Sequence, residues 1–181
     1  MNKSKIRNKI LKLRKNNASK KFKINSDQFL SFLKTNRYNV KNLGGYYPSN
    51  FEIDDLEILV LLEKKNFKIS LPIIKKNNQM DFFKWSSNDL LKINKYGIPE
   101  PVSSKILFPD ILLVPLVAYD YDLNRLGYGA GFYDRYIEKI EKIKKVIKIG
   151  LAFSCQKLKN IPINQYDKKL DFIVTEKEIL K

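Results

Sequence analysis

Apolar residues recur at helical spacing in several stretches of the chain. These stretches predict helices over residues 3–17, 26–37, 54–65 and 131–144. Ser26 or Asp27 is expected near the start of the second helix. Asp54, followed three residues later by Glu57, predicts a capping box at the start of the third. The residues expected to face the core are Ile6, Ile10, Leu13, Phe29, Leu30, Leu33, Phe132, Tyr136, Ile140 and Ile143.

Shorter apolar runs, rich in β-branched and aromatic residues, predict strands elsewhere in the chain. These runs are "FKISLPII", "MDFFKW", "ILLVPLVAY", "VIKIGLAF" and "DFIVT", and Tyr46 with Tyr47 indicates the end of one more strand. "ILLVPLVAY" is apolar almost throughout, which is typical of a strand buried on both faces of a sheet. "GIPEP" predicts a rigid loop, and Pro48 with Ser49 and Asn50 predicts a turn.

Strands that alternate with helices predict the α/β class, with a three-layer, mostly parallel, Rossmann-like sheet flanked by helices. The length of 181 residues and the hydrophobic content of 44% suit a single domain over 1–181 with a substantial core. Ligands of such sheets bind beyond the carboxyl ends of the strands. The stretch "RLGYGAGFYD" lies between a strand and a helix, so the topology places it at that edge.

The chain has one cysteine, Cys155, and no histidine. One cysteine cannot form an intrachain disulfide, which suits a reducing compartment. The apolar runs are too short to cross a bilayer and the N-terminal stretch lacks the core of a secretory signal, so we expect a cytoplasmic protein without membrane contact. Without histidine, His-based triads, His general bases and ordinary His-ligated zinc sites are excluded. Any catalysis must use carboxylates, Lys, Arg, Tyr, backbone donors or a hard metal ion.

The formal net charge of +16 has three explanations. It indicates nucleic-acid binding, attraction of small polyanions such as nucleotides, or a general abundance of lysine and asparagine in the chain. The lysines are scattered and are seldom interleaved with aromatic residues. We therefore favour the compositional explanation and keep the other two open.

"RLGYGAGFYD" concentrates three of the chain's seven glycines, Gly127, Gly129 and Gly131, at alternate positions. Backbone N–H groups of such a loop, together with the start of the following helix, form a site for a phosphate. Arg125 and Asp134 bracket the loop with opposite charges. The spacing is neither the dinucleotide fingerprint nor the Walker pattern, and glycines also serve ordinary turns. Asp134 has the alternative role of complementing the helix dipole.

The longer stretch "VPLVAYDYDLNRLGYGAGFYDRYI" resembles the central motif of the 5-formyltetrahydrofolate cyclo-ligase family, also called methenyltetrahydrofolate synthetases. The segments "KSKIR", "YYPSNFEIDD", "GIPEP", "GLAFSCQ" and "IPINQYDKKLDFIVTE" resemble the family's remaining blocks in the same order. Four positions depart from the pattern. Leu116 and Leu123 replace glycines, Ala130 stands where some members have lysine or glycine, and Phe132 replaces tyrosine.

The resemblance implies ATP- and Mg²⁺-dependent conversion of 5-formyltetrahydrofolate to 5,10-methenyltetrahydrofolate. It also implies the roles of individual residues. The residues implied for ATP are Lys3, Arg7, Arg125, Leu126, Gly127, Tyr128, Gly129, Ala130, Gly131, Phe132 and Tyr133. The residues implied for the folate are Tyr47, Glu52, Tyr128 and Phe132. Asp134 and Asp167 are implied as Mg²⁺ ligands, and Arg125 and Asp134 as catalytic residues.

Other interpretations stay open beside this one. Lys3 and Arg7 are also explained as part of a solvated helix face, and Glu52 as an acidic residue that precedes a helix. Asp167 is also explained as an ordinary acidic residue of a loop, and Tyr133 as a core residue. At the level of the whole protein, the alternatives are a basic nucleic-acid-binding or ribosome-associated protein, and a paralogue with another substrate. For the enzyme we expect folate and ATP as partners, no specific nucleic acid, and a monomer.

Overall fold

The computed structural model describes residues 2–20, 22–36 and 40–181. Its helices are α1 (Lys3–Asn17), α2 (Ser26–Thr35), α3 (Leu56–Lys64) and α4 (Phe132–Glu141), with 3-10 turns at Ala18–Lys20, Lys76–Asn78 and Ser154–Gln156. Its strands are β1 (Asn42–Gly44), β2 (Lys68–Ile74), β3 (Met80–Trp85), β4 (Leu91–Ile93), β5 (Pro99–Pro101), β6 (Ile111–Pro115), β7 (Ala118–Tyr119), β8 (Arg125–Leu126), β9 (Ile147–Leu151), β10 (Phe172–Val174) and β11 (Ile179–Leu180). All four predicted helices are present. Residue 37, the predicted end of the second helix, lies outside the described residues.

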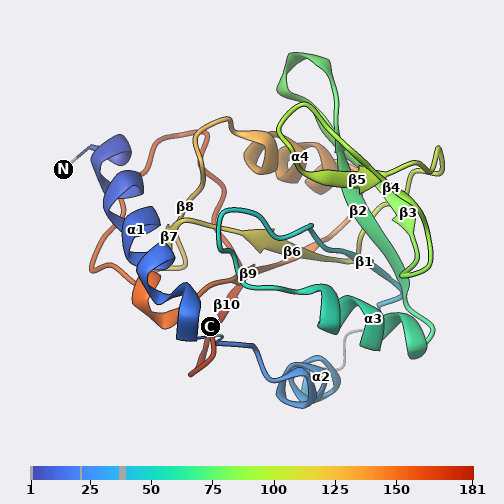
Figure 1. The fold of residues 1–181 in the computed structure, drawn as a ribbon, viewed down its shortest axis with the longest axis horizontal. Coiled ribbons are helices and arrows are strands. Elements are labelled where there is room, and N and C mark those ends of the chain that lie inside the picture. Colours follow the sequence, from blue (N-terminus) through green and yellow to red (C-terminus); the bar gives the residue numbers. More distant parts are fainter. Residues whose placement is uncertain (1, 21, 37–39) are drawn as a thin grey trace.

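A seven-stranded sheet in the order β11-β10-β9-β6-β1-β2-β3 forms the centre of the molecule (Figure 1). The five inner strands run parallel, and each edge strand pairs antiparallel with its neighbour. Two small hairpins, β4–β5 and β7–β8, lie outside this sheet. The mostly parallel α/β sheet expected from the sequence is therefore confirmed.

Helices α2 and α3 cover one face of the sheet, and α4 covers the other (Figure 1). Strand β6 is apolar throughout because it is buried on both faces of the sheet. Ile111 and Leu113 pack with the α2–α3 core, whereas Leu112 and Val114 pack with the α4 core, and all four are fully buried. This double burial places β6 at the middle of three layers, so the loops that follow it emerge near the centre of the molecule.

Helix α1 packs on the β7–β8 hairpin rather than on the main sheet (Figure 1). Ile6 and Ile10 are buried there as predicted, but Leu13 is 37% exposed and its prediction is wrong. Arg14 continues the stripe instead, four residues after Ile10, and is only 1% exposed. Its guanidinium reaches backbone oxygens that make this burial possible.

Three further expectations about local structure are wrong. The third helix has no capping box, because Asp54 accepts a hydrogen bond from the N–H of Leu56 while Glu57 pairs with Lys23. Ile143 is 54% exposed, since α4 ends before it and the helical period is lost. The stretch "GIPEP" contains β5, a two-stranded ribbon in which prolines lacking an N–H are tolerated. Strand β11, at the end of the chain, has no counterpart in the sequence prediction.

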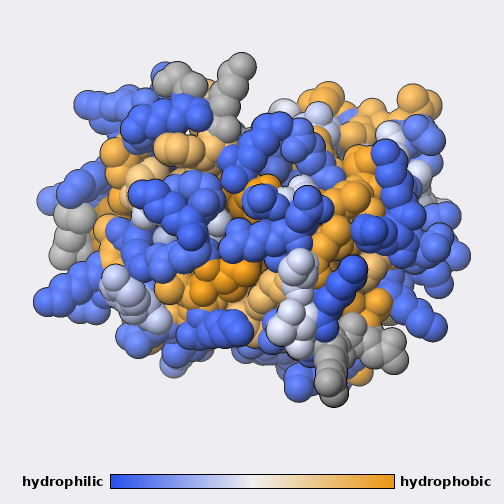
Figure 2. Space-filling view, turned by 90° about the horizontal axis from the view of Figure 1, so that it is seen from below, coloured by the Kyte–Doolittle hydropathy of each residue, from blue (hydrophilic) through white to orange (hydrophobic). Residues whose placement is uncertain are grey.

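The surface is dominated by polar side chains. Figure 2 shows hydrophilic residues over most of one face, with apolar surface visible between them. Within the described part of the chain, no helix is both long enough and apolar enough to cross a membrane.

Candidate active site

A cavity of about 1370 Å³, called here the central cavity, lies beyond the carboxyl ends of three neighbouring parallel strands. Tyr46 and Tyr47 line it just after β1, Ile74 at the end of β2, and Pro115 at the end of β6. This is the edge at which α/β sheets bind ligands. The sheet topology thus brings together loops that are far apart in the sequence.

Every site residue expected from the sequence lines the central cavity. These residues are Lys3, Arg7, Tyr47, Glu52, Arg125, Leu126, Gly127, Tyr128, Gly129, Ala130, Gly131, Phe132, Tyr133, Asp134 and Asp167. They come from α1, the segment after β1, the β8–α4 connection and the segment before β10.

The glycine-rich loop runs from β8 into the N-terminus of α4. Gly129 and Gly131 have φ angles of 110° and 70°, a left-handed region that other residues adopt with strain. A Cβ atom on Gly129 would lie only 3.2 Å from Cζ of Arg7. Arg7 Nε also donates to the carbonyl oxygen of Gly127 at 2.7 Å. The glycines therefore let an arginine of α1 approach the loop backbone closely, beside the positive end of the α4 dipole.

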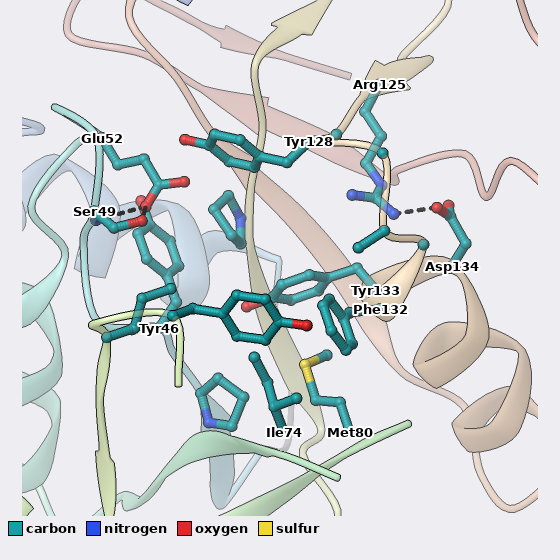
Figure 3. Close-up of a pocket in the computed structure, with 18 of the residues that line it drawn as sticks. Tyr46, Ser49, Glu52, Ile74, Met80, Arg125, Tyr128, Phe132, Tyr133 and Asp134 are labelled. Carbon is teal, nitrogen blue, oxygen red and sulfur yellow. Dashed lines mark hydrogen bonds and ion pairs between the residues drawn. The ribbon is translucent and has the colours of Figure 1, made fainter. Parts of the chain in front are cut away.

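Arg125 and Asp134 form an ion pair across this loop (Figure 3). The Nη2 atom of Arg125 donates to Oδ1 of Asp134 at 2.7 Å, and the N–H of Lys168 donates to the same oxygen at 3.0 Å. The Arg125 side chain is 4% exposed, and its buried Nε has no hydrogen-bond partner within the described residues. A cation with spare donors, held at the cavity wall, suits an anionic ligand.

Asp167 forms a second ion pair at the same cavity, with Lys3 of α1. Oδ2 of Asp167 receives both the Lys3 ammonium and the N–H of Asn164. Among the described residues, the hydrogen bonds to Asp134 likewise end on a single oxygen, Oδ1. Each carboxylate therefore keeps one oxygen that has no partner in the described part of the chain, and carboxylate oxygen is the donor type that Mg²⁺ prefers. Two carboxylates fit such an ion only if phosphate and water supply its other ligands. The described residues contain no group of three acidic, Cys or His side chains able to hold a metal.

Glu52 lies on another wall of the central cavity, away from the Arg125–Asp134 pair (Figure 3). Its Oε2 accepts hydrogen bonds from the N–H of Ser49 at 2.7 Å and from the Ser49 hydroxyl at 3.2 Å. Burial raises the pKa of Glu52, while hydrogen bonds from Ser49 and Tyr128 and the charge of Arg14 oppose that rise. A half-buried carboxylate with remaining acceptor capacity suits a ligand with adjacent N–H donors.

Aromatic and apolar side chains also line the cavity. Figure 3 shows Tyr133 and Phe132 among them, with Ile74 and Met80 below Glu52 and Arg125 in this view. The Tyr133 hydroxyl is buried and has no hydrogen-bond partner among the described residues, and burial raises its pKa well above the usual range. It is therefore a protonated phenol. Tyr133 belongs both to the cavity lining and to the periphery of the α4 core.

Several cavity residues were not expected from the sequence. Ser49 was assigned only to a turn, and Tyr96 directly precedes the stretch "GIPEP" that was mistaken for a rigid loop. Tyr96 packs edge-on against Phe132, with ring centroids 6.1 Å apart. Arg135 folds back to donate to the carbonyl oxygen of Ala130. The spacing of the glycine loop gives no signal for this return of a helical side chain.

Two departures from the family pattern have a structural account. Leu123 has a φ of 63°, so it occupies the left-handed conformation that glycine adopts more readily. Leu116 is 1% exposed, and one of its methyl carbons, Cδ2, would lie 2.7 Å from a Cβ on Gly150. The larger residue after Pro115 therefore packs directly over a glycine of β9.

The chain is similar to known proteins over most of its length. The profile of the 5-formyltetrahydrofolate cyclo-ligase family matches residues 1–176. The chain is 34% identical to the 5-formyltetrahydrofolate cyclo-ligase of Haemophilus influenzae, over 70% of this chain and 71% of the relative. It is 32% identical to that of Mycoplasma genitalium, over 84% and 81%. The NMR structure of Aquifex aeolicus 5,10-methenyltetrahydrofolate synthetase superposes with a TM-score of 0.80 at 31% identity, covering 100% of this chain and 93% of that one.

Proposed function

Because the chain belongs to the 5-formyltetrahydrofolate cyclo-ligase family, we propose that it converts 5-formyltetrahydrofolate to 5,10-methenyltetrahydrofolate with consumption of ATP. The central cavity carries this proposal. One continuous space contains a cationic glycine-rich loop and, on another wall, a carboxylate suited to an amino-pyrimidine ring. A reaction that joins a triphosphate to a pterin needs both in one cavity.

The wall of the cavity formed by the glycine-rich loop and its neighbouring cations, called here the phosphate wall, would hold the triphosphate of ATP. Lys3, Arg7 and Arg125 bring positive charge to the loop, and the backbone from Gly127 to Gly131 supplies the N–H donors. Transfer of a phosphoryl group needs positioning and charge neutralisation more than a covalent side chain. A protein without histidine provides both, which agrees with the composition of this chain.

The free oxygens of Asp134 and Asp167 would ligate Mg²⁺ together with the phosphates. The ion would neutralise negative charge that develops on the phosphates during transfer. Binding would make Asp134 share its charge between the metal and Arg125, and Asp167 share its charge between the metal and Lys3. The two ion pairs thereby orient both carboxylates.

The folate would lie between Glu52 and the aromatic residues. Glu52 would accept hydrogen bonds from the pterin, with Tyr47, Tyr128 and Phe132 bordering the ring. The formyl oxygen, a poor leaving group as it stands, would take the γ-phosphoryl group of ATP, with release of ADP, and form an iminium phosphate. The neighbouring folate nitrogen would then attack the formyl carbon within the same molecule and lose its proton, and inorganic phosphate would depart.

The decisive experiment follows the absorbance of methenyl-folate from 5-formyltetrahydrofolate with Mg-ATP, with ATP alone, and with neither. We expect product only with Mg-ATP, together with one ADP for each product molecule. Product formation that does not need ATP would contradict the proposal. Turnover of ATP that depends on a different acceptor would identify a paralogue with another substrate.

We further propose that residues 1–181 act as a single domain and as a monomer. The main sheet takes strands from Asn42 to Leu180, and one chain supplies both polar walls of the central cavity. Sedimentation of the active protein at the mass of one chain would support this, and activity only in larger species would contradict it.

A further inference from the structure

Arg14 is a buried arginine that none of the roles above uses. It lies on α1 next to the central cavity and is 1% exposed. Burying a guanidinium is costly unless its donors are satisfied. Its Nη1 donates to the carbonyl oxygen of Leu116 at 3.2 Å, and its Nη2 donates to the carbonyl oxygen of Asn50 and to the hydroxyl of Tyr128. One side chain thus ties together the end of β6, the turn before Glu52 and the glycine-rich loop.

The turn that Arg14 holds is strained. Asn50 and Phe51 have φ angles of 47° and 61°, a left-handed conformation that asparagine tolerates but that is unfavourable for phenylalanine. Directly after this turn comes Glu52, whose N–H donates to the carbonyl oxygen of Ser49 at 2.9 Å. The bond from Arg14 to Asn50 therefore helps to fix the backbone that presents the Glu52 carboxylate.

The contact with Tyr128 has a direction set by chemistry. Arginine has donors only, so the phenolic oxygen must accept from Arg14, and its own proton remains free to donate elsewhere. The guanidinium also lies 5.6 Å from the centroid of the Tyr128 ring. The Tyr128 hydroxyl lies toward Glu52 (Figure 3), and hydrogen bonding between the two opposes the effect of burial on the pKa of Glu52.

We propose that Arg14 is a positioning residue for folate recognition, which orients the Tyr128 hydroxyl toward Glu52 and holds the strained turn that carries this carboxylate. The inference rests on the proposed function, since it concerns the folate wall of the same cavity. Arg14 itself does not line the cavity. Its effect should therefore reach the substrate through Tyr128 and Glu52, and leave the binding of ATP alone largely unchanged.

The test compares Arg14→Lys, Arg14→Gln, Tyr128→Phe and the double variant Arg14→Lys/Tyr128→Phe with wild type. Lys15→Gln, an exposed cation on the same helix, is the matched control. Binding of 5-formyltetrahydrofolate is titrated calorimetrically without ATP, and binding of Mg-ATP without folate. Thermal unfolding identifies variants that do not fold.

We expect Arg14→Lys and Tyr128→Phe each to weaken folate binding about tenfold, the size typical of a hydrogen bond to a charged group. The double variant should lose little more than either single one, because both changes break the same connection. Mg-ATP affinity should stay within about twofold in Arg14→Lys, and Lys15→Gln should match wild type. At low pH, folate affinity should fall as Glu52 is protonated; this fall is called here the acid limb. Arg14→Gln removes a positive charge and Tyr128→Phe removes a hydrogen bond, each of which lowers the pKa of Glu52, so both variants should move the acid limb to higher pH.

A folded Arg14→Lys with wild-type folate affinity would overturn the inference, and so would losses that multiply to about a hundredfold in the double variant. If the Arg14 variants do not fold, Tyr128→Phe decides alone, and an unchanged folate affinity and pH profile in it would also overturn the inference. Failure of the proposed function has a different signature, because wild type itself would then form no methenyl-folate.

Discussion

Arg125 has a structural role, as the buried partner of Asp134, and a proposed chemical role as a phosphate ligand in the central cavity. Arg125 is almost fully buried, so Arg125→Ala would leave Asp134 without its cation and create a void. A loss of activity in that variant would mix misfolding with lost chemistry. Arg125→Lys keeps the charge but loses the planar fork, and separates the two effects better.

For Arg125→Lys we expect the KM for ATP to rise by about ten- to a hundredfold, while the KM for the folate stays within about twofold. The reason is that a charged hydrogen bond to phosphate is lost on one wall of the cavity only. Steady-state kinetics with each substrate varied in turn would measure this, beside a thermal unfolding curve. An unchanged ATP dependence in a folded protein would remove Arg125 from the phosphate site.

Glu52 provides a prediction about pH. Burial raises its pKa above that of an ordinary glutamate, so the folded protein takes up this proton at a higher pH than the unfolded chain does. Glu52 therefore lowers stability as pH rises from the unfolded pKa through the folded one. The ionised form that results is the one that, in the proposed function, would accept hydrogen bonds from the pterin. Folate affinity should thus increase with pH across this window.

In Glu52→Gln this acid limb should disappear, and folate binding should be weaker by about tenfold above it, because an amide offers one acceptor and a mismatched donor. Calorimetric titration of each protein between about pH 5 and pH 8 tests both statements. A pH dependence that is the same in the two proteins would assign the acid limb to another group. Equal affinities would move the pterin site elsewhere.

At the scale of elements, the sequence predicted the helices and the main strands because their apolar periods reflect burial directly. β6 is apolar throughout since it is buried on both faces, and Ile6 and Ile10 follow the inward stripe of α1. The glycine loop could be placed for the same reason, since it follows a buried strand in an alternating α/β pattern. These features depend on local sequence and a general rule of topology.

The features that the sequence did not predict depend on contacts between distant segments. Arg14 counts as a polar residue in any periodicity, yet it is buried, with its Nη1 and Nη2 donating to three oxygen atoms from 36, 102 and 114 residues away while its Nε has no partner among the described residues. Arg135 donates to the carbonyl oxygen of Asn78, 57 residues away, as well as to the loop in front of its own helix. The pairing of Lys3 with Asp167 likewise spans 164 residues.

The turn around Leu123 gives a prediction at this scale. Its N–H donates to the carbonyl oxygen of Asp120 at 3.2 Å, and the buried Asp120 carboxylate accepts from Asp122, Asn124 and Ile161. This network holds Leu123 in a left-handed conformation that costs about 1–2 kcal/mol for a residue with a Cβ. Leu123→Gly should therefore be more stable than Leu123→Ala by about 1 kcal/mol, or about 2–4 °C in Tm.

A matched control is Leu158, another half-buried leucine in a loop, whose φ is not positive. There the order should reverse, with Leu158→Ala more stable than Leu158→Gly, because glycine only adds entropy to the unfolded chain. Thermal unfolding of the four variants gives the comparison. If alanine were the better residue at both positions, the turn at Leu123 would not be strained in solution.

For the whole molecule, the question is what the net charge of +16 does. Lys3, Lys75, Lys139, Lys144 and Arg125 form ion pairs with aspartates, and because the two charges of such a pair cancel, the net charge arises from other cations of the chain. The cations at the central cavity are half-buried or buried, whereas lysines such as Lys12 and Lys15 on α1 face solvent. Salt screens exposed charges much more strongly than buried ones.

This difference predicts two salt dependences in one protein. Retention on duplex DNA or RNA, if any occurs, should depend on exposed lysines and fall by about 10³–10⁵-fold between about 50 mM and 200 mM salt. ATP-dependent formation of methenyl-folate should persist at about 0.2 M salt, because in the proposed site backbone donors, buried Arg125 and a metal ion would hold the phosphates. Filter binding and the absorbance assay, run at the same salt concentrations, give the comparison. Salt-resistant, sequence-selective RNA binding without ring closure would instead show that the charge serves a nucleic acid, and would overturn the enzymatic proposal.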